Sequence, residues 1–182
     1  METNSKKGLL RPDILFRNIF EITPDLLLRN GYRGVVFDID NTIAPYEIED
    51  PTEQIKEYLF SLKNQGIQIA FVSNNRGERV SRFNKDLGFL EICNARKPFS
   101  KGIRTAVKTF GIPKSQVVSV GDQLYTDCLS AHLAGIPFYI VPPIKDKSTL
   151  FFRFKRVMEK PFLKSLSHYE EYANDRQSER SV

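Results

Sequence analysis

Four short polar clusters, each following a run of apolar residues, carry the side chains of this sequence that could do chemistry. Four of these residues are carboxylates, and the others are a lysine, two small hydroxyl side chains, an amide and a glycine. Carboxylates and a lysine in one place can bind a cation, hold an anion and transfer protons. In chain order, the candidates are Asp38, Asp40 and Thr42; Ser73 and Asn74; Lys97; and Gly121, Asp122 and Asp127.

The first cluster is the most informative. Asp38 and Asp40 follow Val35, Val36 and Phe37, an apolar run that predicts a buried strand. Two acids at the end of a buried strand cost solvation free energy unless a cation or several hydrogen-bond donors compensate them. Ligands of open α/β sheets bind at the carboxyl ends of the strands. The sequence therefore favours a metal-assisted site at this position.

The elements that must position these residues alternate between strand and helix. Apolar runs predict five strands at residues 34–37, 67–72, 90–93, 117–120 and 138–141, and helical periodicity fills the segments between them. Thr23 and Pro24 mark the start of one helix. The next helix is expected to begin with a capping box, in which Asp50 is the cap, Pro51 the first helical residue and Glu53 the third. We expect an α/β three-layer sandwich with a mostly parallel five-stranded sheet, which would bring the four clusters to one edge.

These motifs resemble those of the haloacid dehalogenase (HAD) superfamily. The resemblance covers residues 34–141 and follows the family order: Asp-x-Asp-x-Thr at Asp38, an apolar run ending in Ser73, then Lys97, then a Gly-Asp pair at Asp122 with a second acid at Asp127. It implies a HAD-like (Rossmannoid) fold. Only short segments separate the first three motifs, so we expect no cap domain.

The resemblance also implies roles for the residues. Asp38 would be the nucleophile that forms an aspartyl-phosphate, and Asp40 would protonate the leaving alcohol and then activate water. Mg²⁺ would be held by Asp38, Asp122 and the backbone carbonyl of Asp40. Lys97 would neutralise charge in the transition state. Thr42, Ser73, Asn74 and Lys97 would bind the phosphate. Gly121 and Asp127 would support the site, and Asp127 would orient Lys97 or a metal-bound water.

The residues in and around these motifs resemble a smaller group within the superfamily. The stretches at residues 71–75, 95–98 and 120–127 resemble the YqeG-type HAD phosphatases of subclass IIIA, which are similar to HAD-type phosphatidylglycerophosphate phosphatases. This implies release of phosphate from phosphatidylglycerophosphate to give phosphatidylglycerol. Arg76 and Arg96 lie near the motifs and are candidates for substrate contact or for solvent. An uncapped site would suit large or surface-bound phosphomonoesters.

Composition sets broad limits on the partners. The 182 residues carry a net charge of +5, with 41% hydrophobic residues, which describes one basic domain with an appendage. The charge permits anionic partners such as phosphate compounds, a membrane surface or RNA, and we expect no DNA partner.

Cys93 and Cys128 show no pairing pattern, which favours a reducing cytoplasm. His132 and His168 read as structural or solvated, and no signal peptide or spanning segment is expected.

The flanks of the core add a membrane hypothesis. We expect residues 1–31 to form an amphipathic helical segment, including a short helix at 9–20, and residues 32–144 to form the phosphatase core. Residues 145–182 would be a basic aromatic extension with a disordered end. Both flanks could lie on an anionic membrane as a peripheral contact, or pack on the core. Two other functions stay open: a capless phosphatase of a soluble sugar, nucleotide or nucleic-acid phosphate, and a non-catalytic module that binds RNA or ribosomal partners.

Overall fold

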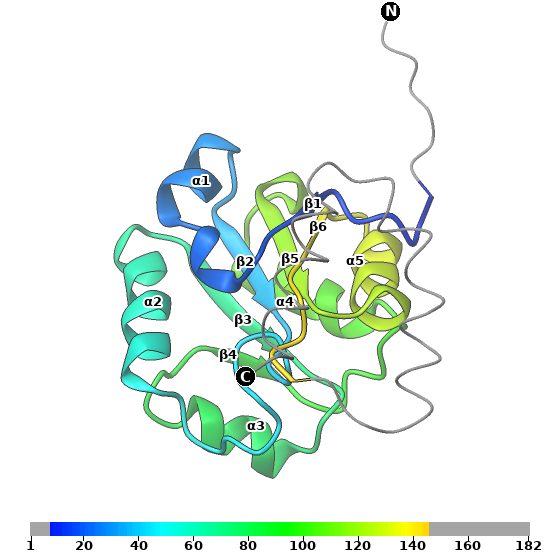
Figure 1. The fold of residues 1–182 in the computed structure, drawn as a ribbon. Coiled ribbons are helices and arrows are strands. Elements are labelled where there is room, and N and C mark those ends of the chain that lie inside the picture. The colour runs from blue at the N-terminus through cyan, green and yellow to red at the C-terminus, as the bar shows by residue number, and fades with distance from the viewer. Residues whose placement is uncertain (1–7, 146–182) are drawn as a thin grey trace, which may run out of the picture.

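Short apolar runs form the strands of a six-stranded sheet in which every neighbouring pair is parallel (Figure 1). This computed structural model describes residues 8–145. The strand order is β1-β6-β5-β2-β3-β4, which places β2 in the middle beside β3 and β5. The strands are β1 (Ile14–Leu15), β2 (Gly34–Phe37), β3 (Gln68–Val72), β4 (Leu90–Ile92), β5 (Val117–Gly121) and β6 (Phe138–Ile140).

Helices cover both faces of this sheet because its strands are apolar on both sides. Along β2, Val35 and Phe37 pack in one buried cluster with residues of α1, α2 and α3, whereas Val36 packs in the other with residues of α4 and α5. The helices are α1 (Pro24–Arg29), α2 (Glu53–Asn64), α3 (Gly77–Asn84), α4 (Lys101–Phe110) and α5 (Leu129–Ala134), joined by short η1 (Ile19–Glu21), η2 (Lys114–Gln116) and the π-helical turn η3 (Leu124–Cys128). The predicted three-layer α/β fold is confirmed.

The number of strands was predicted wrongly. Residues 14–15, expected within a short amphipathic helix at 9–20, form the edge strand β1 beside β6. The stretch is helical only at its end, where the 3₁₀ turn η1 begins at Ile19. The spacing of apolar residues there fits a helix. Pairing with the exposed edge of β6 satisfies the backbone instead, since Asp13 N donates to Phe138 O at 2.8 Å and Phe16 N to Ile140 O at 2.9 Å.

The start of α2 also differs from the expectation. The cap is Thr52, whose hydroxyl oxygen accepts a hydrogen bond from the backbone N–H of Ile55 at 3.4 Å, and Glu53 is the first helical residue. Asp50 and Pro51 therefore lie before the helix. The cap predicted for α1 is correct, because Thr23 accepts from Leu26 N at 3.2 Å and Pro24 begins the helix.

No cap domain is present within residues 8–145. The segment between β2 and α2 holds one isolated bridge, Asp40 to Ala44, and α3 fills the segment between β3 and β4. The predicted division of the chain at residue 31 stays a prediction, although Ile19, Ile22 and Leu27 are buried in the same cluster as the sheet. The expected C-terminal extension, with His168, lies outside the described residues. None of the helices in the described part is both long and apolar enough to cross a membrane.

Candidate active site

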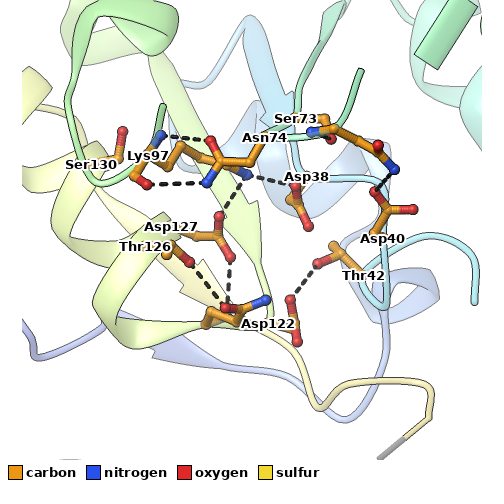
Figure 2. Close-up of polar contacts among 12 residues, drawn as sticks. Asp38, Asp40, Thr42, Ser73, Asn74, Lys97, Asp122, Thr126, Asp127 and Ser130 are labelled. Atoms are coloured by element: carbon orange, nitrogen blue, oxygen red, sulfur yellow. Dashed lines mark hydrogen bonds and ion pairs between the residues drawn. The ribbon is translucent and has the colours of Figure 1, made fainter. Parts of the chain in front are cut away.

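Asp38 lies at the carboxyl end of β2, at the centre of the sheet. Its backbone N–H donates to Val120 O at 3.0 Å, so β5 fixes where the chain leaves the sheet. The residue is 8% exposed, and its Oδ1 lies 2.5 Å from Nζ of Lys97 (Figure 2). The central strand thus delivers a buried carboxylate directly to a buried ammonium group.

Lys97 is held in place from two sides. Nζ lies 2.7 Å from Oδ1 of Asp127 as well as beside Asp38. Its backbone is clamped by Asn74, which accepts from Lys97 N at 2.6 Å and donates to Lys97 O at 3.0 Å. Arg96, with φ of 55°, adopts the left-handed conformation immediately before it. Two loops that are distant in the sequence therefore fix one lysine in the site.

Three buried carboxylates face one another around this lysine. Asp38, Asp122 and Asp127 each offer an oxygen within 4.8 Å of the others, and Asp122 and Asp127 are 1% and 3% exposed. Burial raises the pKa of Asp38 to about 8, with Lys97 opposing that rise and the two other acids adding to it. Burial alone would lower the pKa of Lys97, but Asp127 and Asp38 outweigh it and raise that pKa.

One ammonium group does not balance three carboxylates, so the cluster carries an excess of negative charge in a place with little water. Hard oxygen ligands with excess negative charge are the donor set that divalent cations such as Mg²⁺ take. The hydroxyl of Thr42 adds a hydrogen bond to Asp122 Oδ1 at 3.4 Å. The residues present therefore fit a divalent metal ion.

Asp40 belongs to a different part of the site. Its Oδ2 accepts from Asn75 Nδ2 at 3.3 Å, and its Oδ1 lies 3.3 Å from Nη2 of Arg79, on α3. The Asp40 side chain is therefore not part of the three-acid cluster. Asp38 and Asp40 nevertheless line the same pocket, which has a volume of about 270 Å³. Its walls are formed by Asp38, Asp40, Asn41, Tyr46, Ser73, Asn74, Asn75, Lys97, Gln123, Thr126 and Asp127.

Gly121, at the end of β5, makes the approach of Asp127 possible. A Cβ added at Gly121 would lie 2.6 Å from Cβ and 2.8 Å from Cγ of Asp127, closer than real Cβ contacts come. Oδ2 of Asp127 also accepts the backbone N–H of Gln123 at 3.1 Å. The glycine and the turn of η3 together bring Asp127 back against the end of β5, directly before Asp122.

The structure brings all the predicted site residues together at the carboxyl ends of the strands. Arg76 and Arg96 lie on the neighbouring loops with exposed side chains. Sequence reasoning missed the contributions of Asn75, Arg79 and Tyr46. Asn75 follows Asn74 directly, and a strand ending in two amides is a signal for donors at a site. Arg79 carries no such signal, because its contact with Asp40 depends on how α3 packs.

Comparison with known proteins identifies the class that this fold and site define. The family model for haloacid dehalogenase-like hydrolases matches residues 46–141. A probable phosphatase of Bacillus subtilis, YqeG, is 34% identical over 160 residues, which cover 88% of this chain and 93% of that protein. The chain belongs to the haloacid dehalogenase-like hydrolases. It is therefore a hydrolytic enzyme.

More distant relatives extend the comparison. The phosphatidylglycerophosphate phosphatase 1 of Arabidopsis thaliana chloroplasts and mitochondria is 26% identical over 73% of this chain, which spans 41% of that protein. Among solved structures, the cobalt-bound deoxy-D-mannose-octulosonate 8-phosphate phosphatase of Haemophilus influenzae matches with a TM-score of 0.52. The match is 17% identical and covers 76% of this chain and 90% of that one, so it supports the fold.

Proposed function

We propose that this enzyme is a Mg²⁺-dependent phosphomonoester hydrolase that works through an aspartyl-phosphate at Asp38. The observation that carries the proposal is the buried cluster of Asp38, Asp122 and Asp127 with Lys97 in contact with two of its members. Such a cluster can bind a cation and a phosphate together. The relatedness to a protein named as a probable phosphatase supports the same reaction.

The residues divide the chemistry between them. In the first step, a carboxylate oxygen of Asp38 bonds to phosphorus, the bond from phosphorus to the leaving oxygen breaks, and Asp40 gives its proton to that oxygen. In the second step, a water molecule attacks phosphorus and passes a proton to Asp40, and the bond from phosphorus to Asp38 breaks. Lys97 neutralises charge on the transferring group, while Thr42, Ser73 and Asn74 surround it.

A bound Mg²⁺ would shield the charge of the phosphate from the attacking carboxylate and keep that carboxylate ionised. Asp38 and Asp122 would hold it, with the backbone carbonyl of Asp40. Asp127 lies close enough to join them or to orient Lys97 instead. Burial, with the two neighbouring acids adding to it, raises the pKa of Asp38, and a bound cation would oppose that rise.

For the substrate we propose a phospholipid headgroup, that of phosphatidylglycerophosphate, taken from an anionic membrane surface. Three features support it: the absence of a cap within the described residues, the relatedness to a phosphatidylglycerophosphate phosphatase, and an apolar rim beside the pocket. In this rim Tyr46, Ile48 and Phe99 are 46%, 39% and 70% exposed. A lipid surface could cover these side chains while the headgroup enters the pocket.

The test is phosphate release with and without Mg²⁺. We expect wild-type protein to release phosphate from phosphatidylglycerophosphate in mixed micelles faster than from soluble sugar phosphates, and chelation to stop both. Asp38→Asn should lower kcat by at least about 10³-fold because the nucleophile is lost. Asp25→Asn, an acid on the exposed surface of α1, serves as the control and should leave the rate unchanged.

The outcomes separate the alternatives. A folded wild-type protein that releases phosphate from none of these compounds contradicts the phosphatase proposal and favours a binding module. Faster release from soluble phosphates contradicts the lipid assignment alone. Asp38→Asn should melt no lower than wild type, because burial disfavours the charged carboxylate more than the contact with Lys97 favours it, as the raised pKa of Asp38 indicates.

A further inference from the structure

Arg79, in the first half of α3, places a guanidinium against the carboxylate proposed as general acid. Nη2 of Arg79 lies 3.3 Å from Oδ1 of Asp40, and the two side chains are 13% and 18% exposed. The guanidinium carbon also lies 5.6 Å from the centre of the buried Phe83 ring. Arg79 is thus a largely buried cation directed at Asp40 from outside the phosphate pocket.

The same guanidinium fixes the loop that follows the first motif. Nη1 donates to Glu49 O at 3.1 Å, and Nη2 donates to Pro45 O at 3.4 Å. These carbonyls flank residues 46–48, which include Tyr46 of the pocket wall. One planar group therefore connects Asp40, both ends of the 45–49 loop and helix α3.

The carboxylate of Asp40 is held on both of its oxygens. Arg79 contacts Oδ1 and Asn75 donates to Oδ2, so the plane of the group is set by two donors. Nε of Arg79, in contrast, is buried without a hydrogen-bond partner among the described residues. An unsatisfied buried donor costs stability, and this site retains one.

We propose that Arg79 is a positioning residue for proton transfer by Asp40. This inference rests on the proposed function. A general acid must come within about 2.6–3.2 Å of the oxygen that it protonates, and small displacements are costly. The planar fork of the Arg79 guanidinium reaches Asp40 and both loop carbonyls at once, which the point charge of a lysine cannot do. Arg79 itself touches neither phosphorus nor the leaving oxygen in this role.

This role has a signature that a purely structural role lacks. When the bond to phosphorus breaks, a poor leaving group needs the proton of Asp40, whereas a good one departs without it. Loss of positioning should therefore depend on the leaving group. The ratio kcat/KM reports the steps up to departure of the leaving group, so it isolates this proton transfer from the later attack by water.

The experiment compares phenyl phosphate with p-nitrophenyl phosphate, which are similar in size and differ in how well they leave. For Arg79→Met we expect kcat/KM to fall by about 10²-fold on phenyl phosphate and by less than about tenfold on p-nitrophenyl phosphate. Arg79→Lys keeps the charge without the fork. It should show the same leaving-group difference at a smaller size, and it replaces Arg79→Met if that variant does not fold.

Arg82 supplies a matched control on the same helix. It pairs with Glu49 at 2.5 Å and Asp50 at 3.4 Å, so it also ties α3 to the loop, but its side chain is 54% exposed and forms no ion pair with Asp40. Arg82→Met should leave both kcat/KM values within about twofold. If it produced the leaving-group difference, anchoring of the loop alone would explain the effect and the inference would be overturned.

The remaining outcomes are distinct. Equal losses on both substrates in the Arg79 variants, or no loss, overturn the inference while leaving the phosphatase proposal intact. Wild-type protein that hydrolyses neither substrate with Mg²⁺ overturns the proposed function itself. A selective loss on phenyl phosphate, with unfolding temperatures near that of wild type, supports the positioning role.

Discussion

At the scale of single residues, the site depends on how closely side chains can approach. Lys97 satisfies Asp38 and Asp127 at once, and this requires Asp127 to come back against the end of β5. Gly121 leaves the space for it, since any side chain there would overlap the Asp127 side chain. The backbone of Gly121 does not adopt the left-handed conformation, so the need for glycine comes from space alone.

Gly121→Ala should therefore damage the site as well as the packing. We expect a loss of about 1–3 kcal/mol in the free energy of unfolding from the forced shift, together with at least a tenfold loss of phosphatase kcat as Asp127 moves from Lys97. Urea unfolding and phosphate release measure the two effects.

Gly34→Ala is the matched control for this prediction. A Cβ there would lie 2.9 Å from the Phe110 ring, at the amino end of β2 and away from the acids. It should lower stability similarly while kcat of the folded protein stays near that of wild type. Equal activity in both variants would show that the position of Asp127 is unimportant.

At the scale of elements, the edge strand β1 is attached to the sheet by backbone pairing with β6 and by the side chain of one acid. Oδ2 of Asp13 accepts the backbone N–H of Phe138 at 2.8 Å and lies 3.1 Å from Nε2 of His132. Phe138 is fully buried, so removal of the carboxylate would leave its N–H without this partner. The short strand pairs over two residues only, and side-chain contacts must supply much of its attachment.

Asp13→Ala should lower the free energy of unfolding by about 1–3 kcal/mol, because a buried N–H loses its acceptor. Urea unfolding measures the change. Asp25→Ala removes an acid of the same kind from an exposed ion pair on α1, with both side chains about four-fifths exposed. That control should change stability by less than about 1 kcal/mol. Equal effects would mean that Asp13 does not anchor β1.

At the scale of the whole molecule, exposed apolar side chains gather on the loops that carry the site. Tyr46 and Ile48 follow the first motif, Phe99 follows Lys97, and Ile144 donates its backbone N–H to Asn41 O at 3.0 Å. The exposed Arg76 and Arg96 lie on the same loops. Apolar side chains beside cations suit an anionic bilayer, where each cation near the surface contributes about 1 kcal/mol.

The double variant Ile48→Ser and Phe99→Ser should weaken binding to anionic vesicles by about tenfold or more, because both apolar anchors are lost. Cosedimentation with phosphatidylglycerol vesicles measures the change. Hydrolysis of p-nitrophenyl phosphate should remain within twofold, since neither residue lines the pocket.

Leu9→Ser distinguishes the rim from the N-terminal segment. Leu9 is 51% exposed and lies against α5, where its carbonyl oxygen is 2.8 Å from Nδ1 of His132. We expect it to leave vesicle binding unchanged. If Leu9→Ser weakened vesicle binding and the double variant did not, membrane contact would be assigned to the N-terminal segment instead.

The sequence by itself determined the order of strands and helices from α1 to β6 and the acids, lysine and hydroxyl residues at the centre of the site. Four apolar runs ending in polar side chains are a local pattern, and parallel strands force the ends of such runs to one edge. The caps at Thr23 and the positive φ of Gly111 and Gly135 are local in the same way. The family resemblance and the absence of a cap were predicted from the same motifs.

Only the tertiary structure decided which of these residues touch. Residues 14–15 form a strand because β6 offers an open edge, which no local pattern announces. Asp127 approaches Lys97 and Arg79 approaches Asp40 because helices pack in particular orientations on the sheet. A contact between residues far apart in the chain depends on the summed packing of everything between them, so a sequence pattern predicts the edge where they meet and not the pairs that form there.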